Sequence, residues 1–189
     1  WSGGTSRPRY FQVRGVGELE QYQGAPNPSV GFLIDDIDFS GVGMPATSFD
    51  VEQVEVLRGP QGTRYGANAL AGLINVRTRA PRPEQELQTE FSAGDDGLWS
   101  AGLVAGGAVG MGAGDNGAWR MVAQQSRSDG FRHNRYLGRD DTNGRDELTL
   151  RGRLVLDPVE DWRLGLTLLH ADLDNGFDAF VPDNSFHTI

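Results

Sequence analysis

Five segments in the second half of the chain alternate apolar and polar side chains with a period of two residues. The pattern is clearest in residues 147–156, where four leucines alternate with Glu147, Thr149, Arg151 and Arg153. A strand points successive side chains to opposite faces, so this alternation predicts strands with one apolar and one polar face. The other four segments are residues 86–94, 99–105, 118–127 and 162–172.

The connections between these segments alternate between short and long. Residues 157–160 predict a tight turn, whereas residues 128–145 and the tail from Asp174 are long and rich in Asp, Asn and Gly. This places Trp119 and Trp162 at the short-turn end and Trp99 at the loop end, as in the aromatic girdles of membrane barrels. Residues 95–97 would be an unusually short outer loop. A soluble β-sandwich alternates in the same way, so periodicity alone leaves both folds open.

The first 80 residues follow a less regular pattern. Short runs rich in β-branched and aromatic residues predict strands over 10–13, 30–37, 54–57 and 73–78. A helical turn is expected to begin near Thr47 or Ser48, whose hydroxyl could cap the following amides. Pro81 and Pro83 then break regular structure and predict a linker.

Composition narrows the possible classes. The 27 glycines suit many turns better than helices, and the net charge of −9 disfavours a nucleic-acid partner. Residues 98–114 are uncharged, but they are short for a transmembrane helix and carry six glycines, so they predict strand and turn. The chain opens at Trp1 without the features of a secretory signal, which is expected to have been removed or to lie outside this sequence.

The residues that could carry chemistry do not form a recognisable active site. The glycine-rich turn at 58–66 lacks the Gly-Lys-Ser/Thr of a phosphate loop, and the acidic stretch 140–144 breaks the spacing of a calcium loop. His133, His170 and His187 are too far apart to predict a metal pair. We therefore expect no enzyme, no cofactor and no metal site.

Three blocks of the sequence resemble, in the same order, the plug domain of TonB-dependent outer-membrane receptors. They are residues 11–17, 28–37 and 51–78, within roughly the first 80 residues. Four glycines of the third block, Gly59, Gly62, Gly66 and Gly72, are expected at positive φ or at close backbone contacts. The sequence has Ala71 and Asp36 where the family commonly has glycine, but Asp tolerates the left-handed region, so a turn is still expected there. The motif residues are Arg14, Gly15, Gly17, Asp35, Arg58, Gly59, Pro60, Gln61, Gly62, Tyr65, Gly66, Gly72 and Asn75.

The resemblance implies a mainly β fold, with a small α/β plug domain inside the lumen of a transmembrane antiparallel β-barrel. Of about 22 barrel strands, about five are expected here. Residues 1–80 would be the C-terminal part of the plug, 81–84 a linker and 85–189 the first barrel strands. The family's arginines matching Arg14 and Arg58 are thought to pair with glutamates of later barrel strands.

The function implied by the resemblance is active uptake of a scarce nutrient, a ferric siderophore or other iron complex, through the outer membrane of a Gram-negative bacterium. The implied partners are TonB, contacted through a segment N-terminal to this sequence, the cargo and outer-membrane lipid. The cargo-facing surface would be the plug loops 18–27 and 40–49, with the exposed residues Gln21, Tyr22, Gln23 and Phe49 as candidate contacts.

Three alternatives stay open at this point. One is a receptor of the same family for carbohydrate or cobalamin, and another is a receptor-like signal transducer with an additional upstream domain. The third is a soluble or surface-attached β-rich binding protein without a transport role. Because the first and fifth strands would expose unpaired edges, the membrane reading predicts that this chain alone aggregates or depends on further strands.

Overall fold

The computed structural model describes residues 10–18, 28–42, 47–110, 117–135, 137–159 and 161–176. The chain divides into two compact units, Trp1–Ala80 and Pro81–Ile189. Each unit contains one β-sheet. Within the described residues, no helix has the length and hydropathy that a membrane-spanning helix requires.

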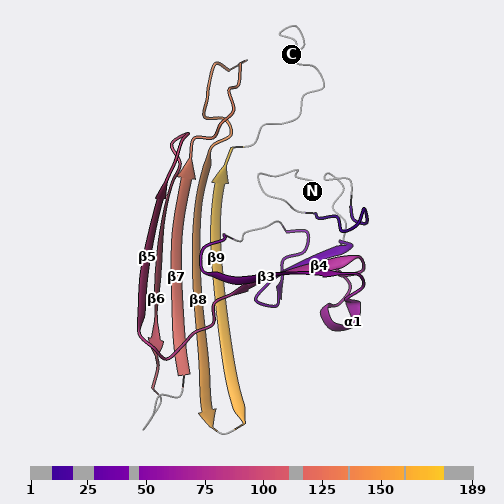
Figure 1. The fold of residues 1–189 in the computed structure, drawn as a ribbon, viewed down its shortest axis with the longest axis vertical. Coiled ribbons are helices and arrows are strands. Elements are labelled where there is room, and N and C mark those ends of the chain that lie inside the picture. Colours follow the sequence, from indigo (N-terminus) through magenta and orange to yellow (C-terminus); the bar gives the residue numbers. More distant parts are fainter. Residues whose placement is uncertain are drawn as a thin grey trace. The chain divides into compact units, whose positions relative to one another are not determined.

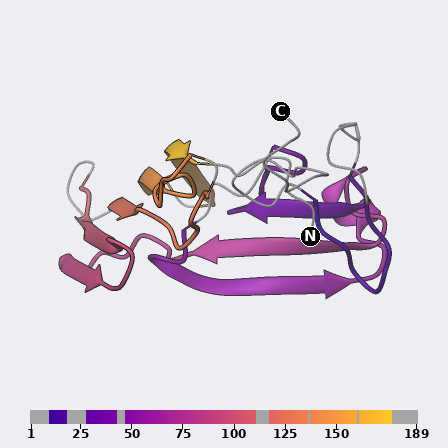
Figure 2. The ribbon, with the colours of Figure 1, turned by 90° about the horizontal axis from the view of Figure 1, so that it is seen from above.

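The first unit is built around a four-stranded mixed sheet. Its strands are β1 (Val30–Ile34), β2 (Ile37–Asp38), β3 (Val51–Arg58) and β4 (Gly72–Thr78), in the spatial order β2-β1-β4-β3. β1 and β4 run parallel, and β3 runs antiparallel to β4, as Figure 2 shows. One short helix, α1 (Gly62–Tyr65), lies in the connection from β3 to β4.

Apolar side chains cover both faces of the central strands of this sheet. On one face Leu33 and Leu73, which are 4% and 1% exposed, form a cluster with Ala69, and Leu57 and Tyr65 pack against it. On the other face the ring of Phe32 stacks on Phe11, with 5.6 Å between the ring centroids. The segment before β1 is therefore part of the packed unit.

Several details of this unit differ from the sequence prediction. The helical turn predicted at residue 47 or 48 is wrong: the Thr47 hydroxyl accepts a hydrogen bond from the Phe49 amide at 2.9 Å, and the chain then enters β3. Residues 10–13 do not form a strand of the sheet, and Val13 makes an isolated bridge to Val16 instead. The segment predicted as one strand over 30–37 is broken by a turn at Asp35 and Asp36.

The second unit is an antiparallel sheet of five strands that neighbour one another in chain order (Figure 1). All five alternating segments are therefore strands, as predicted. Each strand is hydrogen-bonded to the next with few irregularities. The strands are β5 (Glu86–Ala93), β6 (Trp99–Ala108), β7 (Gly117–Ser128), β8 (Arg145–Val159) and β9 (Trp162–Asn175).

The strand register gives this sheet one apolar and one polar face. The pairing aligns Leu87, Ala105, Met121, Gly152 and Leu168 in one row across all five strands. Leu87, Met121 and Leu168 are 76%, 61% and 63% exposed, so this outward face, as we call it, is apolar and uncovered. The opposite face, called the inner face below, carries the polar residues that the alternation predicted.

The ends of the strands refine the predicted turns. β8 continues to Val159, which pairs with Trp162, so the tight turn is shorter than the predicted 157–160 and follows a register shift after Leu156. The short connection at 95–97 does form, with the Gly94 amide bonded to the Leu98 carbonyl at 2.9 Å. The fold is mainly β, as predicted, but the second sheet is open, so a closed barrel stays a prediction.

Candidate functional site

The motif of the first unit forms the connection from β3 through α1 to β4. Gly59 and Gly66 have φ angles of +93° and +84°, as expected for the motif glycines. A Cβ on Gly72 would lie 2.7 Å from the Leu57 carbonyl oxygen, so a side chain there would force the strands apart. Gly62 is different: its φ is not positive and an added Cβ would meet no other residue within 4 Å, so the predicted need for glycine is wrong there. Pro60 and Gln61 lead into α1, where the Gln61 carbonyl accepts bonds from the helix.

Of the two motif arginines, Arg14 lies in a turn and Arg58 is the last residue of β3. Arg14 and Gly15, with φ angles of +54° and +78°, form a two-residue turn closed by hydrogen bonds between Val13 and Val16. Gly17 lies so close to the Phe11 carbonyl that a side chain there would clash. Arg14 and Arg58 are both exposed. Their pairing with glutamates of later strands stays a prediction.

Asp35 combines a turn with a side-chain anchor. Asp35 and Asp36 have φ angles of +48° and +66°, so the turn expected despite the missing glycine does form. The Asp35 carboxylate accepts hydrogen bonds from the Thr78 amide at 2.8 Å and from the Thr78 hydroxyl at 2.6 Å. Thr78 is 3% exposed. The carboxylate therefore continues the β1–β4 pairing beyond the last residue of β1.

Polar contacts also fix the ends and the centre of the sheet. Asn75 is 2% exposed, and its amide donates a long hydrogen bond of 3.4 Å to Glu55 on β3. The Asp38 carboxylate accepts bonds from the Ser40 amide at 2.8 Å and from the Asn68 amide at 2.9 Å. Burial alone would raise the pKa of Asp38, but these bonds outweigh it and the pKa lies below the ordinary value.

The residues predicted to contact cargo are only partly described. Gln21, Tyr22 and Gln23 lie outside the described residues. Phe49 is 6% exposed, so the expectation that it is an exposed loop residue is wrong. Glu18, at the start of the first predicted loop, accepts bonds from the Ser29 amide and hydroxyl, both at 2.7 Å.

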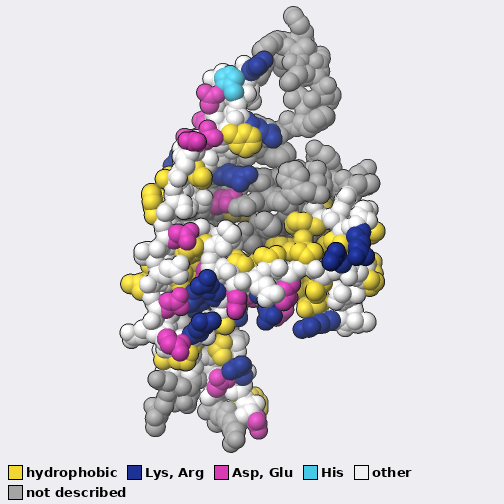
Figure 3. All heavy atoms as spheres, viewed as in Figure 1, with side chains coloured by type: hydrophobic (Ala, Val, Ile, Leu, Met, Phe, Trp, Pro, Cys, Tyr) yellow, Lys and Arg dark blue, Asp and Glu magenta, His cyan; other side chains and the backbone are white. Residues whose placement is uncertain are grey.

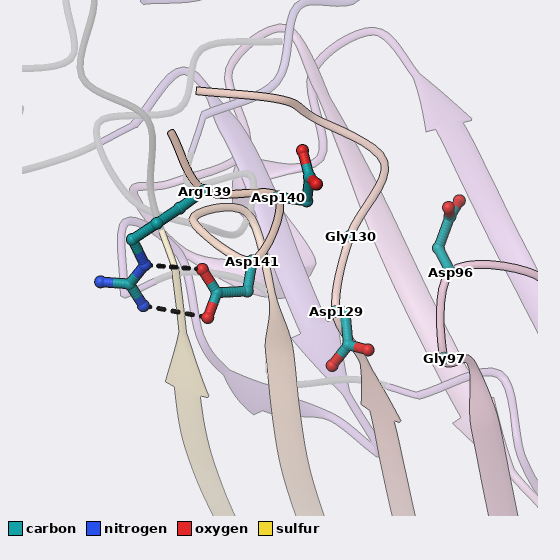
Figure 4. Close-up of a pocket in the computed structure, with 7 residues that line it drawn as sticks. All are labelled: Asp96, Gly97, Asp129, Gly130, Arg139, Asp140 and Asp141. Carbon is teal, nitrogen blue, oxygen red and sulfur yellow. Dashed lines mark hydrogen bonds and ion pairs between the residues drawn. The ribbon is translucent and has the colours of Figure 1, made fainter. Parts of the chain in front are cut away.

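A concave surface lies at the loop end of the five-stranded sheet. It has a volume of about 500 Å³ and is open to solvent. Figure 4 shows carboxylates from separate loops around it, and Figure 3 shows acidic side chains at this end as well as elsewhere on the same side of the molecule. The Arg139 guanidinium donates to both Asp141 oxygens at 2.8 and 2.9 Å and thereby lowers the pKa of Asp141. The lining residues are Asp96, Gly97, Asp129, Gly130, Arg139, Asp140 and Asp141. With four aspartates and one arginine, the lining is predominantly anionic.

Close glycine contacts hold these loops together. A side chain on Gly97 would clash with the Asp129 carboxylate, and one on Gly130 would clash with the Asn143 carbonyl. The Asp129 amide also donates to the Asp96 carbonyl at 2.9 Å, which joins the first loop to the second. We call these packed loops, which contain Asp96, Gly97, Asp129, Gly130 and Asn143, the loop rim.

Sequence reasoning missed one ion pair on the inner face. Arg120 on β7 reaches Glu86 on β5, with Nη1 and Oε2 2.7 Å apart, and its side chain is only 3% exposed. The strand between them has Gly106 in the same row, so no side chain blocks the path. Alternation placed both charges on the polar face, but only the strand register brings them together.

Comparison with known proteins identifies the first unit. Residues 1–73 match the family model described as the TonB-dependent Receptor Plug Domain. The vitamin B12 transporter BtuB of Photobacterium profundum is 25% identical over 178 residues, which cover 94% of this chain and 28% of that protein. The pesticin receptor of Yersinia enterocolitica is 37% identical over 71 residues, which cover 38% of this chain and 10% of that protein.

A solved structure supports the same assignment across both units. The ferric yersiniabactin uptake receptor FyuA of Yersinia pestis aligns with 77% of this chain at a TM-score of 0.65 and 25% identity. The alignment covers 23% of that receptor. The first unit therefore matches the plug domain of TonB-dependent receptors, as the motif resemblance predicted.

Proposed function

We propose that this chain is part of an outer-membrane transporter that takes up a scarce nutrient with energy supplied through TonB, and that the nutrient is an iron chelate. The observation that carries the transport proposal is the combination of a plug domain with a sheet whose outward face exposes apolar side chains from all five strands. In this arrangement the sheet would be the first part of the barrel wall.

The outward face supports a membrane location over the soluble alternative. Soluble monomers rarely expose a large contiguous apolar patch, because that surface is costly in water. Here exposed apolar side chains come from neighbouring strands and lie in shared rows of the register. Hydrocarbon chains of a bilayer would cover such a face without cost. The list of these exposed residues includes Leu87, Phe91, Leu103, Met121, Leu150, Leu164, Leu166 and Leu168.

Two kinds of cargo have specific support. The similarity to the ferric yersiniabactin uptake receptor supports an iron chelate. The vitamin B12 transporter, which aligns with most of this chain, supports cobalamin as the second candidate. The predicted loop residues Gln21, Tyr22 and Gln23 remain our candidates for cargo contacts in either case.

The test compares cells of the source organism with and without the gene. We expect the protein to become more abundant in outer membranes after iron starvation, and uptake of ⁵⁵Fe-labelled siderophores to fall when the gene or TonB is removed. Loss of ⁵⁷Co-cyanocobalamin uptake, with iron uptake unchanged, would replace the iron proposal by the cobalamin one. Recovery of the protein in the soluble fraction would contradict the transport proposal itself.

A further inference from the structure

The chain contains three Asn-Gly pairs, and the structure describes two of them in full. These are Asn143-Gly144, in the loop between β7 and β8, and Asn175-Gly176, at the end of β9. Asparagine followed by glycine is prone to spontaneous deamidation, because glycine has no side chain to shield its amide nitrogen and allows the backbone angles that the reaction needs. Since both pairs have the same two residues, the fold is what distinguishes their reactivity.

The fold holds the Asn175 side chain through both of its polar atoms. The side-chain nitrogen donates to the Glu147 carboxylate at 2.7 Å, and the side-chain oxygen accepts from the Asp146 amide at 3.2 Å. The Gly176 amide, whose nitrogen would be the nucleophile, donates to the Gly144 carbonyl at 2.8 Å. Ring closure at this pair would break these bonds, and the bond to a carboxylate is one of the stronger kinds. Asn175 is therefore protected.

Asn143 is held more loosely. It occupies the third position of a four-residue turn, in which the Gly144 amide donates to the Asp141 carbonyl across 3.4 Å, a long and correspondingly weak bond. Within the part of the chain that the structure describes, the Asn143 side chain makes no hydrogen bond. Neither reacting group, the Gly144 nitrogen nor the Asn143 side-chain amide, is kept away from the other by a strong bond.

We propose that Asn143 is a site of spontaneous deamidation, which changes the charge and the packing of the loop rim as the protein ages. The Gly144 nitrogen attacks the side-chain carbon Cγ, the bond from Cγ to Nδ2 breaks, and ammonia leaves with the proton of the Gly144 amide. The product is a five-membered succinimide ring, which water then opens. Cleavage between Cγ and the ring nitrogen gives aspartate, and cleavage between the main-chain carbonyl carbon and the ring nitrogen gives isoaspartate. The reaction needs only water.

Both products alter the loop rim. Asn143 packs against Gly130, which lines the concave surface, so either product adds a carboxylate beside a lining that already has four aspartates. The Asn143 carbonyl lies so close to Gly130 that even an added Cβ would clash with it. Isoaspartate inserts the Cβ of residue 143 into the main chain and turns this carbonyl into a free carboxylate. The close packing on Gly130 is then lost, so the rim becomes more anionic and less ordered.

The two deamidation rates are measured by peptide mapping with mass spectrometry, after the purified full-length protein has been incubated at mildly alkaline pH. We expect Asn143 to react about tenfold faster or more than Asn175 in the folded protein, because Asn175 must first be released by local opening. In urea-denatured protein the two rates should become similar. Equal rates in the folded protein, or an equally large difference in the denatured protein, would overturn the proposal.

Two variants test whether the hydrogen bonds are the cause. Glu147→Ala removes the carboxylate that holds the Asn175 side chain, so it should speed deamidation of Asn175 and leave the rate at Asn143 unchanged. Glu90→Ala, which removes an exposed glutamate of β5, is the matched control and should change neither rate. If Glu147→Ala left Asn175 as slow as before, the protection that we assign to the fold would be disproved.

The effect on the loop rim is tested on aged protein by amide hydrogen exchange. Anion exchange separates deamidated molecules by their additional negative charge, and peptide mapping selects those altered at residue 143. The isoaspartate form should exchange the Gly130 amide about tenfold faster or more, whereas Asn143→Asp, which adds the charge without lengthening the main chain, should change it less. Asn143→Gln keeps an amide but closes a ring far more slowly, so its rim should not change with age. Unchanged exchange in the isoaspartate form would contradict the loss of packing.

Discussion

Replacing Leu168 by arginine gives the most direct test of the membrane assignment. Leu168 lies on the outward face of β9 and is 63% exposed. The outward face of β9 carries Trp162, Leu164, Leu166 and Leu168, followed by His170 and by Asp172, about ten residue steps after Trp162. At about 3.3 Å per step and a tilt of about 45°, these residues span roughly 23 Å along the membrane normal, close to the apolar belt of about 25 Å in outer-membrane barrels. Leu168, roughly 14 Å from Trp162 on this scale, lies near the middle of the belt.

The expected cost follows from this depth. An arginine near the bilayer midplane of a β-barrel costs about 2–4 kcal/mol, and one near the interface costs about 0–1 kcal/mol. Leu168→Arg should therefore lower the folding equilibrium constant roughly 30- to 700-fold. Asp172→Arg, on the same face of the same strand but beyond the belt, is the matched control and should change it less than tenfold.

The assay is reversible unfolding of the full-length protein in lipid vesicles by guanidinium chloride, followed by tryptophan fluorescence. The reasoning would be refuted if Leu168→Arg and Asp172→Arg had equal stabilities. That result would mean that Leu168 faces water, where an exposed leucine can be replaced by arginine at little cost.

Three further predictions concern the plug. Leu73→Ala should destabilise the plug by about 2–5 kcal/mol, because removing most of a buried leucine side chain leaves a cavity. The measurement is urea unfolding, followed by a signal from the plug. Asp36→Gly should change the same free energy of unfolding by less than about 1 kcal/mol, because glycine removes the strain of φ +66° but adds conformational entropy to the unfolded chain. A large loss of stability would contradict the turn. Because the pKa of Asp38 is lowered by folding, its stabilising contribution is present above its ordinary pKa of 3.8 and is lost as the pH falls below that value, so exchange of the Ser40 amide should accelerate in acid and not between pH 6 and 8.

The strands of the second sheet could be predicted from sequence because each depends on a local pattern. Every residue of a segment such as 147–156 contributes to the same two-residue period, and the structure keeps that period from Arg145 to Leu156 of β8. The short helix α1 could not be found this way, since four residues hold barely one helical turn and no periodic signal. The hydroxyl of Thr47 suggested a helix cap, but hydroxyls accept the same bond in turns that lead nowhere near a helix.

The contact of Asp35 with Thr78 depends on information that a local pattern does not contain. Asp35 and Thr78 are 43 positions apart in the chain, and only the parallel pairing of β1 with β4 brings them into contact. Asp35 was recognised as a motif residue, but its partner was not. The burial of Phe49 has the same origin: a loop aromatic is exposed or buried according to distant residues that pack on it.

The loop rim bears on how the proposed receptor could choose its cargo. Gly97 and Gly130 pack against neighbouring backbone and side chains, so these loops are already ordered before any ligand arrives. A ligand that meets an ordered surface loses less affinity to the freezing of loop conformations. An insertion beside either glycine would break the packing between the loops. Over evolution, new cargo preferences at this end would therefore arise more easily by replacing the aspartates that line the concave surface than by changing loop length.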